Sequence, residues 1–342
     1  MNIEPLRTAV VGCGWHGTAL AKAVVQSEHL QLVACADTDA AATRSVAVLA
    51  DGVTSHASIA ELLGAADVDA VVIATTHDAL APTALAAIRA GKHVMIEKPM
   101  ALNEEQAKEV EFAAASADVT CMVGYSFRYG MAKYVLQLLA QGAVGDTRAI
   151  TGAIGTPAME DGWVAQASSG GGPMLYVGCH LIDLALWIAG EEPSEVTAEA
   201  HYRGDTGVDE TSAVTLGFSD RRLAQLMVTQ NASGFFYDMR VIGSAGFVGL
   251  RGRNFVQFEI EVQSHVLDAY REPTIIRPAM QGDHITMMLV PELAEFATAI
   301  ADQRPPAITA TDGRRVLRVI DAIGQSSQTQ RPVALTPTLS AY

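Results

Sequence analysis

The chain has 342 residues, a length that allows two domains, and with 49% hydrophobic and 18% charged residues its composition suits folded cores and argues against disorder. Lys and Arg total 23 against 38 Asp and Glu, a net charge of −15, so we expect no nucleic-acid partner and no binding to anionic membranes. We expect no leader peptide and no transmembrane run of about 20 apolar residues. The four cysteines are widely spaced, which predicts reduced thiols and no metal site. These features together predict a cytoplasmic protein.

Over the first 124 residues, short runs rich in Val, Ile and Ala alternate with Ala-rich segments of helical spacing. Unbroken apolar runs are typical of strands buried on both faces of a parallel sheet, and they occur at 7–11, 30–36, 68–74, 94–97 and 119–123. Helices are predicted at 18–26, 82–90 and 104–115, with Pro82 at a helix start and Asn103 as an N-cap. This alternation predicts a doubly wound α/β domain over residues 1–124.

After residue 124 the pattern changes. A helix is predicted at 131–141, and strand-like runs follow at 147–154, 195–201, 211–218, 222–228, 239–243 and 255–262. Polar and apolar residues alternate in several of these runs, which indicates an antiparallel sheet with one covered face. We expect helices at 181–189, 291–301 and 312–323 to cover it, giving an α+β domain over residues 125–342.

The first predicted strand leads into a GxGxxG turn, Gly12-Cys13-Gly14-Trp15-His16-Gly17, which opens a helix. Gly12 permits a tight turn, Gly14 lets the backbone approach a pyrophosphate, and Gly17 lets the helix pack closely on the strand. The helix N-terminus offers unpaired N–H groups and partial positive charge to the phosphate. Asp37, twenty residues after Gly17, ends the second strand, where a carboxylate binds the diol of the adenosine ribose.

These residues predict a dinucleotide site, to which we also assign Trp15 and His16. NAD is favoured over NADP, because a 2′-phosphate would meet like charge at Asp37, and the next two residues supply no arginine to receive it. Arg44 is the nearest basic residue, and it would weaken that preference only if its helix turned it back toward the ribose.

Further motifs follow the later strands of this domain: Ala74-Thr75-Thr76-His77, and the run Ala90–Pro99 that ends in Glu97-Lys98-Pro99. With the glycine turn, these residues resemble the Gfo/Idh/MocA family of oxidoreductases. The resemblance extends through Gly124-Tyr125, the glycines at 170–172 with His180 and Asp183, and the closing stretch 313–333, so it covers nearly the whole chain.

The resemblance implies a Rossmann domain followed by an α+β domain with a large, open-faced, mostly antiparallel sheet. It also implies NAD(P)-linked redox chemistry on a sugar, a polyol or a derivative, and homodimers or homotetramers formed through the exposed sheet. The nicotinamide is expected near Thr75, Thr76, His77 and Lys98.

Lys98 ends a parallel strand and therefore projects into the crevice where such sheets bind ligands. Oxidising an alcohol removes its hydroxyl proton while hydride leaves for nicotinamide. A lysine can take that proton if its surroundings lower its pKa, ordinarily about 10.4, and a protonated lysine can stabilise the developing alkoxide. The alternative is an ordinary surface lysine. Glu97 is assigned to holding the ribose or the lysine.

Tyr176, His180 and Asp183 follow the glycine run at four- and three-residue steps, so they share one face of a predicted helix and look out from it. In the family, an Asp commonly stands first, and the histidine and the lysine handle the proton of the reacting hydroxyl. His180 and Asp183 match that pattern, whereas Tyr176 replaces a carboxylate with a phenol that stays neutral at pH 7. We expect Tyr176 to contact substrate and Asp183 to orient His180; pure packing for Tyr176 and a structural role for His180 are the alternatives.

Of the family's usual paired arginines only Arg128 remains, in Ser126-Phe127-Arg128, and a less cationic pocket favours a neutral substrate. The sequence predicts an NAD-dependent dehydrogenase of a neutral sugar, polyol or related cyclic alcohol, with Lys98 and His180 handling the hydroxyl proton and Arg128, Tyr176 and Asp183 at the substrate. Two alternatives stay open: redox-neutral elimination or epimerisation with retained NAD, and a nucleotide-sensing regulator without turnover.

Overall fold

The computed structural model describes residues 4–204, 206–254, 257–278 and 282–336. Contacts within the chain divide it into two units. The first comprises residues 1–129 and 282–314, and the second comprises residues 130–281 and 315–342. The first unit therefore includes residues 282–314, a segment from late in the sequence. A division of the chain at one boundary near residue 124 would not place this segment in the first unit.

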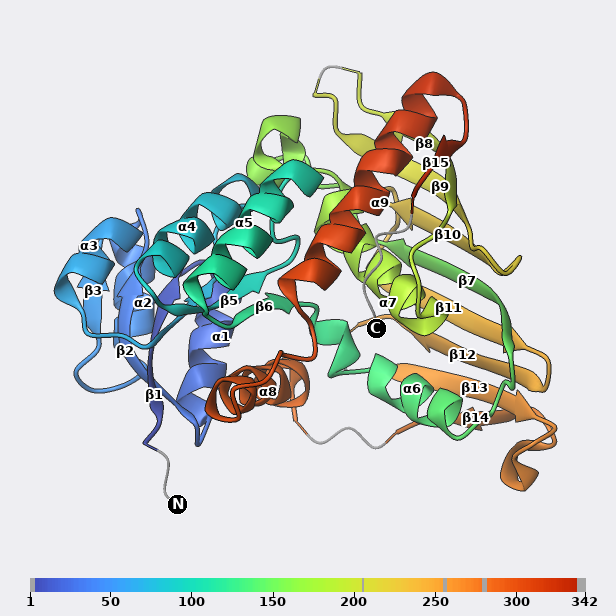
Figure 1. The fold of residues 1–342 in the computed structure, drawn as a ribbon, viewed down its shortest axis with the longest axis horizontal. Coiled ribbons are helices and arrows are strands. Elements are labelled where there is room, and N and C mark those ends of the chain that lie inside the picture. Colours follow the sequence, from blue (N-terminus) through green and yellow to red (C-terminus); the bar gives the residue numbers. More distant parts are fainter. Residues whose placement is uncertain (1–3, 205, 255–256, 279–281, 337–342) are drawn as a thin grey trace. The chain divides into compact units, whose positions relative to one another are not determined.

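Six parallel strands form the sheet of the first unit, in the order β3-β2-β1-β4-β5-β6 (Figure 1). They are β1 (Leu6–Val11), β2 (Leu30–Ala36), β3 (Thr54–His56), β4 (Ala70–Ile73), β5 (His93–Glu97) and β6 (Cys121–Gly124). All of β4 and nearly all of β5 are buried, which explains their unbroken apolar runs. The order reverses between β1 and β4, so the predicted doubly wound α/β sheet is confirmed.

Five α-helices connect these strands: α1 (Trp15–Gln26), α2 (Ala40–Ala47), α3 (Ile59–Ala65), α4 (His77–Arg89) and α5 (Glu104–Ala117). The predicted N-cap is confirmed, because the Asn103 side chain accepts the N–H of Gln106 at 3.0 Å. The predicted helix start at Pro82 is wrong: α4 begins at His77, after a three-residue connection from β4, and Pro82 lies inside it. The Asp78 carbonyl that loses its helical donor belongs to an exposed residue, so water can replace the missing bond.

The returning segment of the first unit contains η6 (Ile285–Leu289), a π-helical turn, and α8 (Val290–Ala301). Both pack on α1. Leu293 and Phe296 join Leu20 and Val24 in the core of this unit. The expectation that the helix at 291–301 covers the antiparallel sheet is therefore wrong, because an apolar helical face does not by itself specify which sheet it covers.

Nine strands form the sheet of the second unit, in the order β14-β13-β12-β11-β7-β10-β9-β8-β15. They are β7 (Thr147–Gly155), β8 (Glu195–Tyr202), β9 (Asp209–Gly217), β10 (Leu223–Thr229), β11 (Phe236–Gly243), β12 (Gly246–Gly252), β13 (Phe258–Ser264), β14 (Thr274–Ile276) and β15 (Val333–Ala334). Among the described strands of this second sheet, β7 and β10 form the one parallel pair, so the predicted mostly antiparallel sheet is confirmed. Residues 255 and 256 of the predicted run 255–262 lie outside the described residues.

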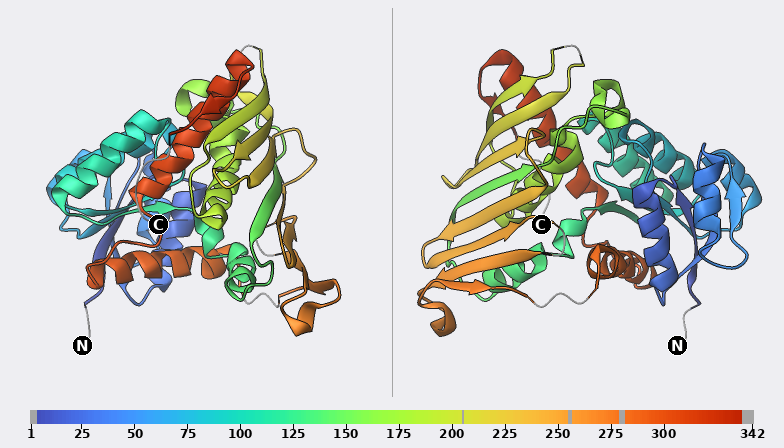
Figure 2. Two further views of the ribbon diagram at one scale, coloured as in Figure 1. Left: turned by 45° about the vertical axis from the view of Figure 1, so that its right-hand side comes forward. Right: turned by 180° about the vertical axis from the view of Figure 1, so that it is seen from behind.

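Helices cover one face of this sheet: α6 (Ala132–Ala140), α7 (Cys179–Ala189) and the later part of α9 (Ala310–Thr329) (Figures 1 and 2). Helix α7 lies against β7 and β10, α6 lies against β12, and the Ser326 hydroxyl of α9 accepts the N–H of Ala198 at 3.0 Å. In the described part of the chain no helix covers the opposite face, where Leu223, Met227 and Ile242 are exposed.

The stretch Ala167–Ala189 is long and apolar enough to cross a membrane by length and composition alone, so the expectation that no such stretch exists is wrong. Most of it is buried within the fold, however. The core helix of a water-soluble protein passes the same test, so the match is weak evidence for a membrane span.

Candidate active site

The glycine turn lies at the carboxyl end of β1, at the point where the strand order reverses. Gly12 has a φ of +87°, and a Cβ there would overlap the carbonyl oxygen of Ala74. A Cβ on Gly17 would overlap the carbonyl oxygen of Gly12, so α1 approaches β1 more closely than a side chain allows. Gly14 differs, because apart from its own chain neighbours no atom lies within 4 Å of its Cβ position. The fold itself therefore requires two of the glycines, and the third leaves the backbone open to a ligand.

Asp37 follows β2 and is bonded to this turn. Its Oδ2 accepts the N–H of Cys13 at 2.6 Å, and its Oδ1 accepts the N–H of Asp39 at 2.9 Å. Oδ1 also accepts the Thr38 hydroxyl at 3.4 Å. Each carboxylate oxygen has two lone pairs, so Oδ2 keeps one for a hydroxyl of a diol, and the weak bond from Thr38 can be exchanged for a second. No side chain caps the N-terminus of α1 at Gly14, and its first N–H groups are therefore available to an anion.

Glu97, at the end of β5, is buried and paired with the glycine turn. Its Oε1 lies 2.8 Å from Nε2 of His16, and its Oε2 accepts the backbone N–H of Lys98 at 3.2 Å. Burial by itself would raise the pKa of Glu97, but His16 and Lys98 together hold that pKa below its ordinary value. Gly124 leaves room for this carboxylate, since a Cβ there would lie 2.9 Å from Oε1. Glu97 thus joins the glycine turn to the strand end that carries Lys98.

Trp15, the first residue of α1, is 71% exposed and stacks on His284, with ring centroids 5.8 Å apart and planes at 13°. Burial lowers the pKa of His284; the charge of His16 acts in the same direction and Asp283 opposes it. Sequence reasoning did not select His284, because no spacing relates the returning segment to the turn.

The remaining predicted residues of the first unit also follow strands. Thr75 and Thr76 lie in the short connection between β4 and α4. Thr76 is the N-cap residue of α4, and His77, the first residue of that helix, is buried. The register aligns Val11 with Ile73 and Ile73 with Ile96, so the ends of β1, β4 and β5 meet at one edge of the sheet.

Arg128 closes η1 (Ser126–Arg128), a 3-10 turn after β6. It is buried, and its guanidinium donates to the carbonyl oxygen of Ala307 at 3.5 Å. A backbone carbonyl in the returning segment is therefore one of its partners, which the sequence did not indicate.

The second unit carries Tyr176, His180 and Asp183 on one continuous helical stretch, η4 (Met174–Gly178) followed by α7. Regular α-helical spacing was expected, but η4 is a π-helical turn, whose i→i+5 bonds widen the helix just before His180. Tyr176 is half-buried, and its ring meets that of Trp163 edge-on at 6.2 Å. His180 and Asp183 are buried, so neither side chain faces bulk solvent.

Asp209, at the start of β9, is a residue that sequence reasoning missed. Its Oδ2 accepts the N–H of Met174 at 3.1 Å, and a Cβ on Gly172 would overlap its Oδ1. Burial raises the pKa of Asp209 to about 6, against the opposing hydrogen bonds from Met174 and Ser212. The bond joins residues 35 positions apart, and no motif links them, so the sequence offered no signal for it.

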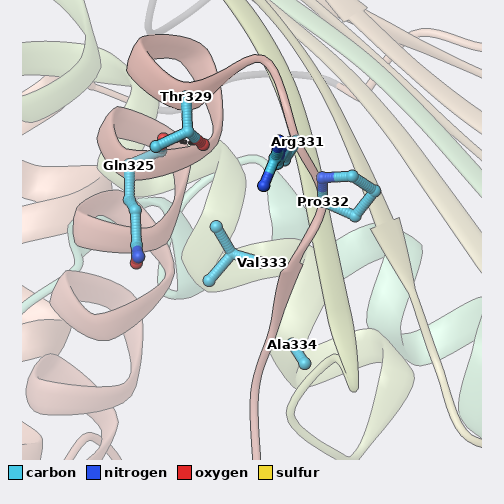
Figure 3. Close-up of a pocket in the computed structure, with 6 residues that line it drawn as sticks. All are labelled: Gln325, Thr329, Arg331, Pro332, Val333 and Ala334. Carbon is cyan, nitrogen blue, oxygen red and sulfur yellow. Dashed lines mark hydrogen bonds between the residues drawn. The ribbon is translucent and has the colours of Figure 1, made fainter.

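The structure also contains an open surface hollow of about 630 Å³ (Figure 3). It lies where α9 and β15 meet and is lined by Gln325, Thr329, Arg331, Pro332, Val333 and Ala334. None of the predicted site residues lines it, and its side chains offer no acid–base pair for catalysis. Across the described residues, no group of three or more His, Cys, Asp or Glu side chains could hold a metal ion.

The parallel sheet, the open glycine turn and the carboxylate after β2 define a dinucleotide-binding protein of the Rossmann type. Residues 6–125 match the family model described as "Oxidoreductase family, NAD-binding Rossmann fold", and residues 132–248 match the GFO/IDH/MocA C-terminal domain. The chain belongs to the Gfo/Idh/MocA family of oxidoreductases and contains an NAD-binding domain, as the sequence motifs predicted.

Similar proteins include dehydrogenases and proteins of solved structure. A trans-1,2-dihydrobenzene-1,2-diol dehydrogenase of Xenopus laevis is 31% identical, over 58% of this chain and 61% of that protein. An inositol 2-dehydrogenase of Rhizobium meliloti is 29% identical, over 96% of this chain and 99% of that protein. The crystal structure of aldose-aldose oxidoreductase from Caulobacter crescentus, complexed with glycerol, superposes with a TM-score of 0.85 at 25% identity, covering 97% of this chain and all of that one.

Proposed function

We propose that this protein is an NAD-dependent dehydrogenase that oxidises a neutral sugar, polyol or related cyclic alcohol. The observation that carries the proposal is the shared sheet edge of the first unit, where the open glycine turn, the Asp37 carboxylate and Lys98 all follow parallel strands. The similarity to an inositol dehydrogenase over nearly the whole chain supports a polyol as the substrate class.

The residues present fit NAD. Gly14 leaves space that a Cβ would fill, the uncapped N-terminus of α1 suits a pyrophosphate, and Asp37 suits the adenosine ribose. We assign Trp15, His16 and Thr75–His77 to the same cofactor. Bound NAD would supply the hydride acceptor.

The proton chemistry belongs to the side chains. Lys98 accepts the hydroxyl proton or stabilises the alkoxide, and His180 shares this task. Glu97 positions the strand end that carries Lys98 and is a positioning residue. Asp183 orients His180, and Tyr176 and Arg128 contact the substrate. With one buried arginine and a phenol in place of a carboxylate, such a site suits hydroxyl groups better than phosphates.

The cofactor preference gives a test at Asp37. Asp37→Asn keeps an oxygen that can accept the N–H of Cys13 but removes the charge that repels a 2′-phosphate. We expect the ratio of NADP to NAD dissociation constants to fall roughly tenfold, mainly through tighter NADP binding. Isothermal titration with both cofactors measures this ratio, and Asp51→Asn, a change at an exposed position, is the control. An unchanged ratio in Asp37→Asn contradicts the ribose assignment.

We also propose that a second copy of the chain covers the open face of the nine-stranded sheet, in a homodimer or homotetramer. Leu223, Met227 and Ile242 are exposed there on β10 and β11, and an uncovered apolar sheet face favours association. Met227→Lys places a charge on this face, so we expect it to shift the mass measured by light scattering toward that of one chain, 36.1 kDa. Val48→Lys, at an exposed position of the first unit, should leave the mass unchanged. A single-chain mass for the unmodified protein would refute the proposal.

A further inference from the structure

The helical stretch that carries Tyr176 and His180 begins at a turn with little steric freedom. Gly172 has a φ of +107°, and a side chain at Gly171 would overlap the carbonyl oxygens of Val164 and Gln166. The N–H groups of Gly171 and Gly172 bond to the same two carbonyls, at 2.9 Å to Gln166 and 3.1 Å to Val164. The turn is therefore fixed on one side by the backbone of residues 164–166.

Asp209 fixes the other side of this turn. Its carboxylate accepts the first helical N–H, that of Met174, and contacts Gly172, whose carbonyl oxygen in turn accepts the N–H of Tyr176 at 3.0 Å. A chain of direct contacts thus runs from Asp209 to the backbone of Tyr176, four residues before His180. A displacement at Met174 would shift the helix start and the ring of Tyr176 with it.

The surroundings of Asp209 stabilise the ionised carboxylate poorly. Ser212 on its own strand and the N–H of Met174 donate to the carboxylate, Val208 packs beside Gly172, and Tyr202 is its register partner on β8. None of these groups is a cation. Burial raises the pKa of Asp209 to about 6 from its ordinary value of 3.8, so at neutral pH the ionised carboxylate destabilises the fold. A neutral Asn or Ser would cap a helix without that cost.

We propose that Asp209 is a positioning residue for substrate binding: its charge-assisted bond to Met174 holds the glycine turn and the first helical turn, and thereby Tyr176, in the binding geometry. A carboxylate holds a backbone N–H more strongly than a neutral acceptor does. The ionised Asp209 therefore lowers the stability of the whole fold but makes the glycine turn more rigid. The role in substrate binding rests on the proposed function, whereas the local rigidity does not.

Two variants test this, Asp209→Ala and Asp209→Asn. Hydrogen exchange measured by mass spectrometry on peptides covering 170–180 should rise roughly three- to thirtyfold in Asp209→Ala and less in Asp209→Asn, whose amide oxygen still accepts the Met174 N–H. In Asp209→Asn the stability of the whole protein should increase. Because the ionised carboxylate becomes destabilising as pH rises from about 4 through about 6, this variant should melt about 3 °C higher at pH 8 and gain less at pH 5.

Kinetics with NAD and myo-inositol, or the best polyol of a substrate panel, complete the test. Asp209→Ala should raise KM for the polyol several-fold more than it raises the NAD dissociation constant, and Asp209→Asn should restore most of the loss. Asn103→Ala, which removes the cap of α5, should raise exchange in α5 alone and leave KM unchanged.

Three results overturn the inference: unchanged exchange over 170–180 in Asp209→Ala, an equal rise throughout the second unit, or a normal KM despite increased local exchange. A lower melting temperature of Asp209→Asn at pH 8 overturns the claim that the charge is costly. If the unmodified protein oxidises no polyol, the proposed function fails, and the exchange data still decide whether Asp209 fixes the turn.

Discussion

Replacing Lys98 with methionine is expected to lower kcat roughly a hundredfold to ten-thousandfold, while NAD binds with nearly unchanged affinity. Methionine keeps much of the length and apolar stem of lysine but can neither accept the hydroxyl proton nor stabilise an alkoxide, and groups with such a task contribute about that much to rate. The Lys98 charge acts on Glu97, but the bonds that Glu97 makes to His16 and to the backbone N–H of Lys98 do not use the Lys98 ammonium, so the glycine turn should keep its shape. Steady-state kinetics and cofactor titration separate the two effects.

Lys108→Met is the matched control, because Lys108 is exposed on α5, away from the strand ends. It should leave both kcat and the NAD dissociation constant unchanged. A Lys98→Met enzyme with a near-normal kcat would remove the lysine from the mechanism. Loss of NAD binding together with activity would instead make Lys98 part of the cofactor site rather than of the proton chemistry.

Gly14→Ala is expected to weaken NAD binding about 10- to 100-fold without changing the melting temperature. The backbone at Gly14 has φ −65° and ψ −165°, which alanine adopts, and its Cβ position is empty of protein atoms. The added methyl group therefore disturbs nothing in the fold and meets only what binds against the turn. An overlap of this kind costs about 1–3 kcal/mol, which sets the expected loss of affinity.

Alanine substitutions at two other glycines serve as comparisons for Gly14→Ala. Gly17→Ala should destabilise the protein strongly, since its methyl group would overlap the carbonyl oxygen of Gly12. Gly64→Ala, in helix α3 with open space around it, should change neither stability nor NAD affinity by much. Thermal melts with cofactor titrations on all three variants make the comparison. Undiminished NAD affinity in Gly14→Ala would show that the cofactor does not approach this backbone.

The sequence predicted the first sheet well, because each buried strand is a continuous apolar run followed by a turn motif. It missed β3, α2 and α3. Strand β3 is three residues long and mostly exposed, so it lacks the apolar run that marks a buried strand. It also assigned 291–301 to the second unit. That error has a physical cause. The apolar face of α8 packs on α1 through Leu293 and Phe296, and helical periodicity shows that a helix has an apolar face but not which element that face packs against.

For the candidate site, the motifs located the glycine turn, Asp37 and Lys98, because those residues are adjacent to strand ends in the sequence. The partners that hold them were not predictable in the same way. His284 stacks on Trp15, Asp209 caps the turn before Tyr176, and His16 pairs with Glu97. Each of these contacts joins segments far apart in the chain, and only the folded backbone brings them together.

The most direct measurement is the absorbance at 340 nm of the purified protein mixed with NAD and a panel of neutral polyols led by myo-inositol. We expect NADH to accumulate in step with loss of at least one polyol, and not with Lys98→Met. Consumption of the polyol without NADH would mean a redox-neutral reaction, and no consumption across the panel would contradict a polyol dehydrogenase.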